Sequence, residues 1–251
     1  FKTISIKDIV IYKLIMISFL IIMKNSHSIE QYTAHGGPVK GLAVSTNNKL
    51  MASASFDYSV VVWDLNPIKE KITLIGHDAA VNAVEFSPRN DFLVSGGDDN
   101  NILLWSLNDI HKINEEIEPI RLGNHRGKIA DLEFSSDGKF LLSASWDGTV
   151  GVWDLKERKK IHSLVGHKGP VYSVKYSKDG KYIYSSGYDG EIKLWKVNNG
   201  EYVRPLIKNG WGISKFEVDE KQNFIAFGST DGQIKINKFD QDETILNIKE
   251  D

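Results

Sequence analysis

The chain of 251 residues has no cysteine and only six prolines. The lack of cysteine excludes disulfide bonds, thiol catalysis and covalent haem attachment through C-x-x-C-H within this chain. It is compatible with an oxidising compartment without requiring one. Enzyme motifs are missing as well: neither G-x-S-x-G nor H-E-x-x-H occurs, and no glycine-rich phosphate loop joins a strand to a helix. We therefore expect no catalytic residue and no cofactor.

A strongly basic region is also missing. Residues 1–28 hold four lysines and one aspartate, so the rest of the chain has 27 basic and 32 acidic side chains, a net charge of −5. This balance does not predict a nucleic-acid partner. No stretch of residues 29–251 keeps a helical periodicity, which favours a chain of strands and turns.

The chain does contain a repeat. Four tryptophans each follow a histidine by 28 residues, and each has a serine ten residues and an aspartate six residues before it. The histidines are 42, 48 and 42 residues apart. Such self-similarity indicates a repeated unit of a few strands. The four sets are His35, Ser53, Asp57 and Trp63; His77, Ser95, Asp99 and Trp105; His125, Ser143, Asp147 and Trp153; and His167, Ser185, Asp189 and Trp195.

One unit, residues 171–207, shows four strands. VYSVKYS at its start alternates apolar and polar residues, which is the period of a strand. KDGK and YDGE are turn signals on either side of a second strand, YIYSS, and IKLWKV forms the third. YVRPLI forms the fourth, where Pro205 suits an outer strand with one open edge.

The repeated segments carry a family resemblance. SASFDYSVVVWDL, SGGDDNNILLWSL, SASWDGTVGVWDL and SSGYDGEIKLWKV resemble WD40 repeats, and each follows AHGGPV, GHDAAV, NHRGKI or GHKGPV. The resemblance covers residues 29–251. It implies an all-β fold, a β-propeller whose blades are four-stranded sheets around a central channel. HDAAVNAVEFSP and SASWDGTVGVWDL more narrowly resemble bacterial exported WD40 proteins that carry a c-type cytochrome module after the propeller, a module that this chain does not contain.

The resemblance also implies a role for each repeated side chain. In WD40 repeats the aspartate accepts a hydrogen bond from the histidine, the histidine bonds the serine, and the serine meets the tryptophan indole. We call each such set a tetrad and expect it to be structural. A metal site is not expected, because the histidines lie on separate blades and no blade supplies a second close ligand. The remaining histidines, His27, His111 and His162, fall outside the frame and are expected in exposed loops or strands.

A fifth unit keeps the spacing but not the residue types. Asn209 and Asn237 stand in place of histidine and tryptophan, and Asp231 retains the aspartate. We expect its sheet to be held mainly by its neighbours. WD40 propellers commonly have seven blades, and Ile29–Thr33 looks like an outer strand. We therefore expect five four-stranded blades that are a fragment of a seven-bladed propeller, with a closed five-bladed ring as the alternative. A fragment would expose strand edges on the first and fifth blades.

Residues 1–28 differ from the rest. Lys13 precedes an apolar core at 14–23, and Ser26 and Ser28 place small residues before a cleavage point at the end of the segment. This layout is typical of a secretory signal peptide, which would make the protein periplasmic or otherwise exported. The alternatives are an uncleaved membrane anchor, partly upstream translation in a cytoplasmic protein, and a strand of a missing blade.

We expect the activity to be binding, since a rigid propeller presents loops from many blades on one face. We expect a non-enzymatic scaffold for a protein or peptide partner, with membrane contact only through an uncleaved N-terminus. The alternative is the propeller portion of a periplasmic c-type cytochrome protein whose haem module lies beyond this chain. A propeller enzyme is a third class, disfavoured because the repeat supplies no convergent acid or base.

In WD40 repeats, the residue before the tetrad aspartate and the residue five after the tetrad histidine point to the narrow face around the channel. The first set here is Phe56, Asp98, Trp146, Tyr188 and Thr230, and the second is Lys40, Asn82, Ala130, Tyr172 and Ser214. The aromatic members, Phe56, Trp146, Tyr172 and Tyr188, are the candidate partner-binding residues. Three of them fall on adjacent blades, so we expect the site there. The alternative is that these rings pack against neighbouring loops.

Overall fold

The computed structural model describes residues 32–108, 117–221, 223–238 and 244–249. All regular structure in these ranges is β-strand, which confirms the predicted all-β fold. The strands form four-stranded antiparallel sheets whose strand order follows the chain. Among these residues, no helix offers the length and apolarity that a membrane crossing needs.

Two expectations fall at the edge of the described residues. The predicted signal peptide or anchor at 1–28 lies outside them, as do His27 and His111. The expected outer strand at 29–33 lies mostly outside them too, and its described residues, Tyr32 and Thr33, are not in a strand.

Each sheet is one blade. Blade 1 contains β1 (Val39–Val44), β2 (Leu50–Ser55), β3 (Ser59–Leu65) and β4 (Ile68–Ile75). Blade 2 contains β5 (Val81–Phe86), β6 (Phe92–Gly97), β7 (Asn101–Ser106) and β8 (Ile120–Asn124). Blade 3 contains β9 (Ile129–Phe134), β10 (Phe140–Ser145), β11 (Thr149–Asp154) and β12 (Lys159–Val165). Blade 4 contains β13 (Val171–Tyr176), β14 (Tyr182–Gly187), β15 (Glu191–Lys196) and β16 (Tyr202–Lys208). Blade 5 contains β17 (Ile213–Asp219), β18 (Phe224–Ser229), β19 (Gln233–Lys238) and β20 (Thr244–Lys249).

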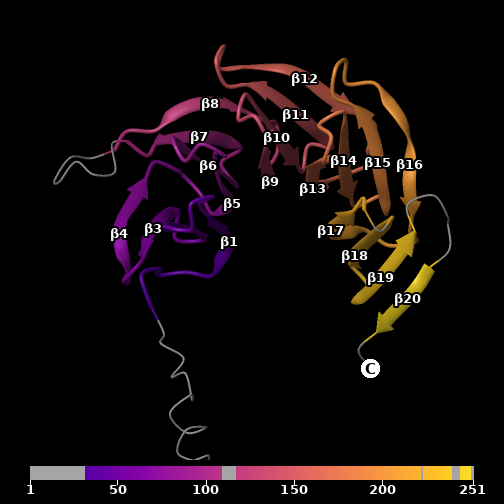
Figure 1. The fold of residues 1–251 in the computed structure, drawn as a ribbon, viewed down its shortest axis with the longest axis horizontal. Helices are drawn as coiled ribbons and strands as arrows, with labels where there is room; N and C mark the ends of the chain where they lie inside the picture. Colours follow the sequence, from indigo (N-terminus) through magenta and orange to yellow (C-terminus); the bar gives the residue numbers. More distant parts are fainter. Residues whose placement is uncertain (1–31, 109–116, 222, 239–243, 250–251) are drawn as a thin grey trace, which may run out of the picture. The chain divides into compact units, whose positions relative to one another are not determined.

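Recurring tight turns set the sheet order. The turn between the first and second strands holds one residue with positive φ in every blade, an asparagine or a glycine, because these residues tolerate the left-handed conformation best. These residues are Asn48, Asn90, Gly138, Gly180 and Asn223. Within the unit Ala34–Asp251, the first strand of each blade lies on the inner side and the fourth on the outer side (Figure 1). The inner strands β1, β5, β9, β13 and β17 line one central cavity.

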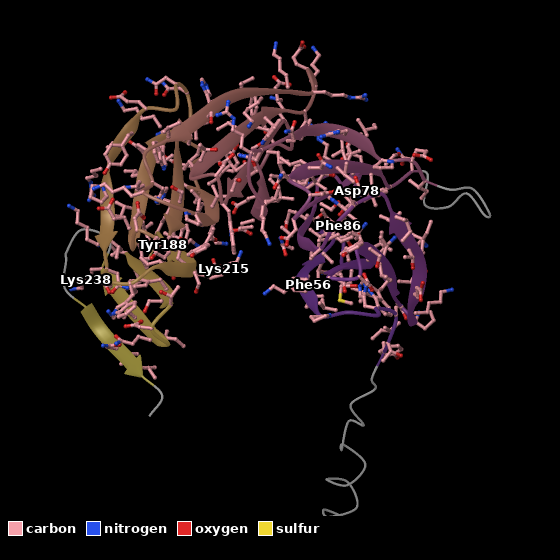
Figure 2. The ribbon with its side chains drawn as sticks, turned by 180° about the vertical axis from the view of Figure 1, so that it is seen from behind. Phe56, Asp78, Phe86, Tyr188, Lys215 and Lys238 are labelled. Carbon is pink, nitrogen blue, oxygen red and sulfur yellow. The ribbon has the colours of Figure 1, made fainter. Side chains whose placement is uncertain are left out.

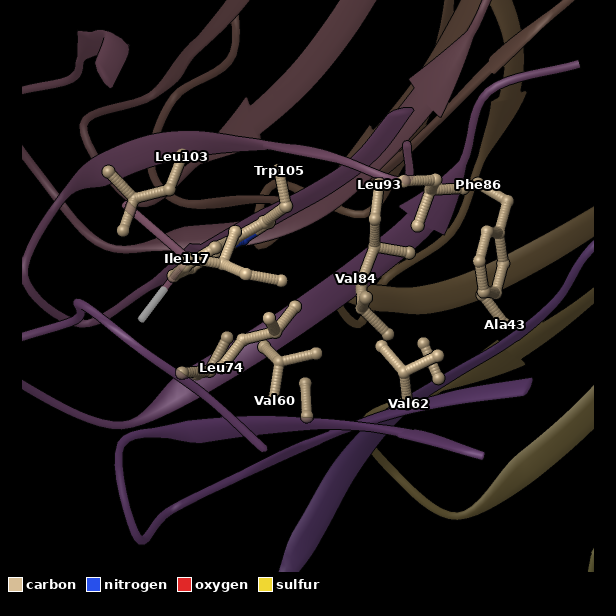
Figure 3. Close-up of a cluster of buried hydrophobic side chains, with 14 residues drawn as sticks. Ala43, Val60, Val62, Leu74, Val84, Phe86, Leu93, Leu103, Trp105 and Ile117 are labelled. Atoms are coloured by element: carbon tan, nitrogen blue, oxygen red, sulfur yellow. The ribbon is translucent and has the colours of Figure 1, made fainter. Parts of the chain in front are cut away.

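The hydrophobic core lies between neighbouring blades. Figure 3 shows the interface of blades 1 and 2, where Val60 and Val62 of β3 face Val84 of β5 and Trp105 of β7. All four side chains are buried, and a fully buried aliphatic side chain stabilises the fold by about 1.5–3 kcal/mol. Equivalent clusters join blades 2 and 3, 3 and 4, and 4 and 5. Blades 2, 3 and 4 are therefore each held on the preceding blade by the face that carries the tryptophan.

The two end blades have faces without such cover among the described residues. Leu42 of β1 is 66 % exposed, whereas Val84 at the same register of β5 is buried against blade 1. On blade 5, Ile234 and Ile248 are exposed, whereas Ile192 at the first of these registers in blade 4 is buried. The end blades thus carry apolar side chains that are solvent-exposed among the described residues.

Candidate functional site

Blades 1 to 4 each contain a chain of side-chain hydrogen bonds. In blade 3, the Trp153 indole N–H donates to Ser143 Oγ at 2.8 Å. The serine hydroxyl lies 2.7 Å from His125 Nε2, and His125 Nδ1 lies 2.9 Å from an Asp147 carboxylate oxygen. Because a carboxylate accepts only, His125 Nδ1 donates and Nε2 accepts from the serine. The corresponding distances in the other three tetrads are 2.7–2.9 Å.

The tetrad aspartate also joins two turns. Asp147 accepts hydrogen bonds from the backbone N–H of Arg126 and of Thr149, each at 3.0 Å, and from Thr149 Oγ1 at 2.7 Å. Burial alone would raise the pKa of Asp147, but the bonds from His125, Thr149 and Arg126 outweigh it and hold that pKa well below its ordinary value. The pKa values of Asp57, Asp99 and Asp189 are lowered in the same way. The tetrads therefore fix the turns at one end of each blade.

Blade 5 lacks this chain. Phe227 stands at the tetrad serine position, since it pairs with Lys235 as Ser185 pairs with Lys193 in blade 4. Asn237 is buried in place of tryptophan, and its Oδ1 has no hydrogen-bond partner among the described residues. Asn209 instead accepts a bond from Lys235 Nζ at 2.7 Å. A different and smaller polar contact thus occupies the place of the tetrad.

The structure brings three of the four candidate partner-binding residues together. Trp146 and Tyr172 meet edge to face, with ring centroids 6.3 Å apart. Burial raises the pKa of Tyr172, and the neighbouring Tyr188 raises it further. Trp146 is 49 % and Tyr188 63 % exposed. Phe56 lies apart on blade 1, with Lys40 Nζ 5.8 Å from its ring centre, whereas Tyr188 lies on blade 4 (Figure 2).

A fourth aromatic ring continues the row onto blade 5. Trp211 is 61 % exposed and lies in the turn before β17. Its turn abuts that of blade 4, because a Cβ on Gly190 would lie 2.8 Å from the Trp211 carbonyl oxygen and one on Gly212 would lie 3.2 Å from Tyr188 Cα. Trp211 lies at neither of the two repeat positions from which the other aromatic residues were predicted. The sequence does distinguish Trp211 by the size of its side chain, because the equivalent position in the other repeats holds only a glycine or an alanine. These residues are Gly37, Ala79, Gly127 and Gly169.

We call Trp146, Tyr172, Tyr188 and Trp211 the narrow-face patch. Trp146 and Tyr172 also line the central cavity, together with Phe56. The other frame residues at this end of the cavity are polar or small: Lys40, Asn82, Asp98, Ala130, Ser214 and Thr230. Asp98 accepts a hydrogen bond from Asn82 of its own blade at 2.8 Å and one from Lys128 of blade 3 at 2.5 Å. Lys128 Nζ in turn lies 5.3 Å from the Trp146 ring centre.

Deeper in the cavity wall, charged residues from four blades meet. Lys175 pairs with Glu217 at 2.9 Å, and Lys215 pairs with Asp131 at 2.7 Å. Glu85 and Glu133 occupy one register on β5 and β9 and have no ion-pair partner within 4 Å among the described residues. Burial raises the pKa of each to about 7, and nearby carboxylates add to the effect.

The described residues contain no group of three or more histidine, cysteine or acidic side chains placed to hold a metal ion. His162 lies in β12 and pairs with Val152. Lys160 lies with Nζ 4.6 Å from the Trp153 ring centre. The sequence does not reveal this contact because it depends on how β11 and β12 pair.

Comparison with known proteins identifies the repeat. The family model described as WD domain, G-beta repeat matches residues 26–64, 68–106, 118–154 and 158–196, more than half of the chain. The chain therefore belongs to the WD40-repeat family, and its sheets are propeller blades. The matched segments end before blade 5, which lacks the tetrad histidine and tryptophan. No curated protein matches the chain, and the narrower resemblance to cytochrome-fused proteins finds no support.

Proposed function

We propose that this WD40-repeat chain is a non-enzymatic scaffold that binds a protein or peptide partner at the narrow-face patch. The observation that carries the proposal is the row of aromatic rings, from Trp146 to Trp211, exposed on three consecutive blades. Exposed tryptophan and tyrosine side chains in a cluster are the residue types that dominate binding energy at protein interfaces.

The patch is also held rigidly. The Trp146 backbone N–H donates to the Lys128 carbonyl at 2.9 Å, and the Tyr188 N–H donates to the Pro170 carbonyl at 2.8 Å. Each ring therefore projects from a turn that is tied to the preceding turn of its own blade. A surface that is ordered before binding loses little conformational entropy in the complex, which favours affinity.

The test is affinity capture followed by substitution. Once a partner is identified by pull-down, Trp146→Ala and Tyr188→Ala should each weaken binding by about 2 kcal/mol or more, with the fold unchanged by circular dichroism. Phe56→Ala is the matched control, since Phe56 holds the same frame position on blade 1. Unchanged affinity in both patch variants would show that the partner binds elsewhere. An equal loss of affinity in Phe56→Ala would show that the binding site includes blade 1.

We further propose that the protein is exported and that its mature form begins at Ile29. The support is the order of Lys13, the apolar core 14–23 and the small residues Ser26 and Ser28. N-terminal sequencing of protein recovered from the periplasm of a bacterial host tests the cleavage. Recovery from the cytoplasm with residues 14–28 intact would contradict export.

A further inference from the structure

The narrow face is electrically uneven. The residue after the tetrad histidine is Arg126 on blade 3 and Lys168 on blade 4, both exposed. The same position is Gly36 on blade 1 and Asp78 on blade 2. At this position, exposed cations therefore stand on the two blades that carry Trp146, Tyr172 and Tyr188, and a carboxylate stands on blade 2.

These cations are presented on fixed backbone. The Arg126 N–H donates to Asp147 and the Lys168 N–H donates to Asp189, each at 3.0 Å. Their side-chain nitrogens form no ion pair within 4 Å among the described residues. The tetrad carboxylates nearest to them are already occupied by histidine and backbone donors. The two cations are thus available to an incoming anion.

A third cation strengthens the field at blade 3. Lys160 lies over the Trp153 ring, where burial lowers its pKa and the positive charge of Arg126 lowers it further, against the attraction of Asp147. Two positive groups that repel each other favour a negative group between them. The turns of blades 3 and 4 therefore combine exposed aromatic rings with the positive charges of Arg126 and Lys168.

We infer that the partner at the narrow-face patch is an acidic polypeptide segment. An apolar or aromatic side chain of the segment contacts Trp146, Tyr172 and Tyr188, and carboxylates beside it pair with Arg126 and Lys168. This inference rests on the proposed function, because it assigns the chemistry of the partner at the same site.

A nucleic acid is the competing occupant, because its bases also stack on aromatic rings. A polyphosphate backbone that continued around the face would pass the carboxylates of Asp78 and Asp98 on blade 2. A peptide can place its acidic side chains over blades 3 and 4 alone. The uneven charge of the face therefore favours the polypeptide.

The experiment uses the whole chain and a display library of random twelve-residue peptides. We expect enriched peptides to carry aspartate or glutamate within a few positions of an aromatic or large aliphatic residue. The double variant Arg126→Glu and Lys168→Glu should bind these peptides at least tenfold more weakly, and raising the salt concentration should weaken binding to the original chain. Single-stranded DNA of twenty nucleotides is the second probe.

A matched control is available on the same two blades. Lys139 and Lys181 are exposed and occupy equivalent turns at the opposite ends of β9 and β13. Changing both to glutamate alters the net charge by the same amount. This control should leave peptide affinity within about twofold, because charges more than a Debye length away are screened.

The outcomes separate the two proposals. Enriched peptides without acidic residues, or affinity that survives the Arg126 and Lys168 reversal, would overturn the acidic segment while leaving the scaffold function intact. DNA that binds more tightly than every peptide, and loses that binding on reversal, would overturn the polypeptide class. Peptides that bind equally well to Trp146→Ala and Tyr188→Ala would overturn the patch itself, as would a library from which no peptide is enriched.

Discussion

Blades 3 and 5 have the same four-stranded order and similar strand lengths, yet they differ in what fills them. In blade 3 a single chain of hydrogen bonds runs from Trp153 through Ser143 and His125 to Asp147. In blade 5 Phe227 and Asn237 stand at two of these positions, and Asn237 is buried with an unpaired oxygen. The sheet therefore does not need a tetrad in order to form.

The comparison separates two roles. Alternating apolar residues and left-handed turns are present in both blades, and they determine strand order and register. The tetrad adds a buried network in which every member has a partner, which specifies one arrangement of the turns. Blade 5 replaces part of it with the bond from Lys235 to Asn209. We therefore expect blade 5 to be the less stable of the two.

The largest expected effect comes from removing the buried tryptophan. Trp153→Ala should lower the free energy of unfolding by about 3–5 kcal/mol, the usual cost of truncating a large buried aromatic side chain. Asn237→Ala, at the same position of blade 5, should cost less than about 1 kcal/mol, because its Oδ1 already lacks a partner. Urea denaturation of both variants measures this. Similar urea midpoints for the two variants would contradict the claim that the tetrad makes blade 3 more stable than blade 5.

A second test neutralises the aspartate. Asp147→Asn should cost about 2 kcal/mol, because it weakens hydrogen bonds to a charged acceptor and presents a donor to His125. Asp231→Asn should cost much less, because Asp231 is partly exposed and its side-chain donor among the described residues is Ser229 alone. Thermal unfolding at pH 7 compares the two. An equal loss in both would show that the tetrad aspartate has no special weight.

The same variant predicts a pH dependence. The pKa of Asp147 is lower in the folded chain than in the unfolded chain, so its carboxylate stabilises the fold above its unfolded pKa and loses this effect as the pH falls. The stability difference between the original chain and Asp147→Asn should therefore shrink from pH 6 toward pH 2. A difference that is constant over this range would contradict the role of the charge.

A third test extends the comparison to the inner strands. Glu217 on blade 5 has an ion-pair partner, whereas Glu85 on blade 2 has none within 4 Å among the described residues. Glu85→Gln should raise stability by about 1–2 kcal/mol at pH 8, because it removes a half-buried carboxylate that must be charged there. Glu217→Gln should not raise it. Urea midpoints at pH 8 give both values.

The size of this stability gain changes with pH. The pKa of Glu85 is raised to about 7 in the folded chain from its ordinary value of 4.5, so folding binds a proton between these values and stability falls as the pH rises through that window. The gain from Glu85→Gln should therefore be smaller at pH 5 than at pH 8. A gain that does not depend on pH would assign it to packing instead.

The smallest expected effect is a gain in blade 5. Asn237→Leu should stabilise the chain by about 1 kcal/mol, because it removes the unpaired buried oxygen and adds apolar surface. Trp153→Leu is the matched variant and should destabilise blade 3, since it deletes the indole donor to Ser143. A loss of stability in Asn237→Leu would show that the asparagine is held by contacts that a leucine cannot replace.

Much of the fold could be predicted because its information is local and repeated. The segment 171–177 was predicted as a strand, and β13 spans Val171–Tyr176. The segment 192–197 was predicted as a strand, and β15 spans Glu191–Lys196. Alternation and turn residues suffice for this, since each strand pairs with the next one along the chain.

The site was less predictable because it depends on contacts between blades. The frame predicted Trp146 and Tyr188 as surface residues, but their neighbour Trp211 lies outside the frame and is recognised only where turns of adjacent blades meet. The bond from Lys128 to Asp98 and the unpaired Glu85 beside Glu133 join residues from different repeats. No spacing within one repeat encodes these pairs.

The tetrad aspartate has one more consequence, which concerns how such a protein changes over generations. Asp147 accepts a backbone N–H, so the bond that fixes its turn does not depend on which side chain Arg126 carries. The residue just before each tetrad aspartate is likewise free to differ, and in this chain it is phenylalanine, aspartate, tryptophan and tyrosine in four successive blades. Each blade thus offers interchangeable display positions on a fixed frame. A new partner can be acquired by exchanging single surface residues, one blade at a time, while the frame beneath them is retained.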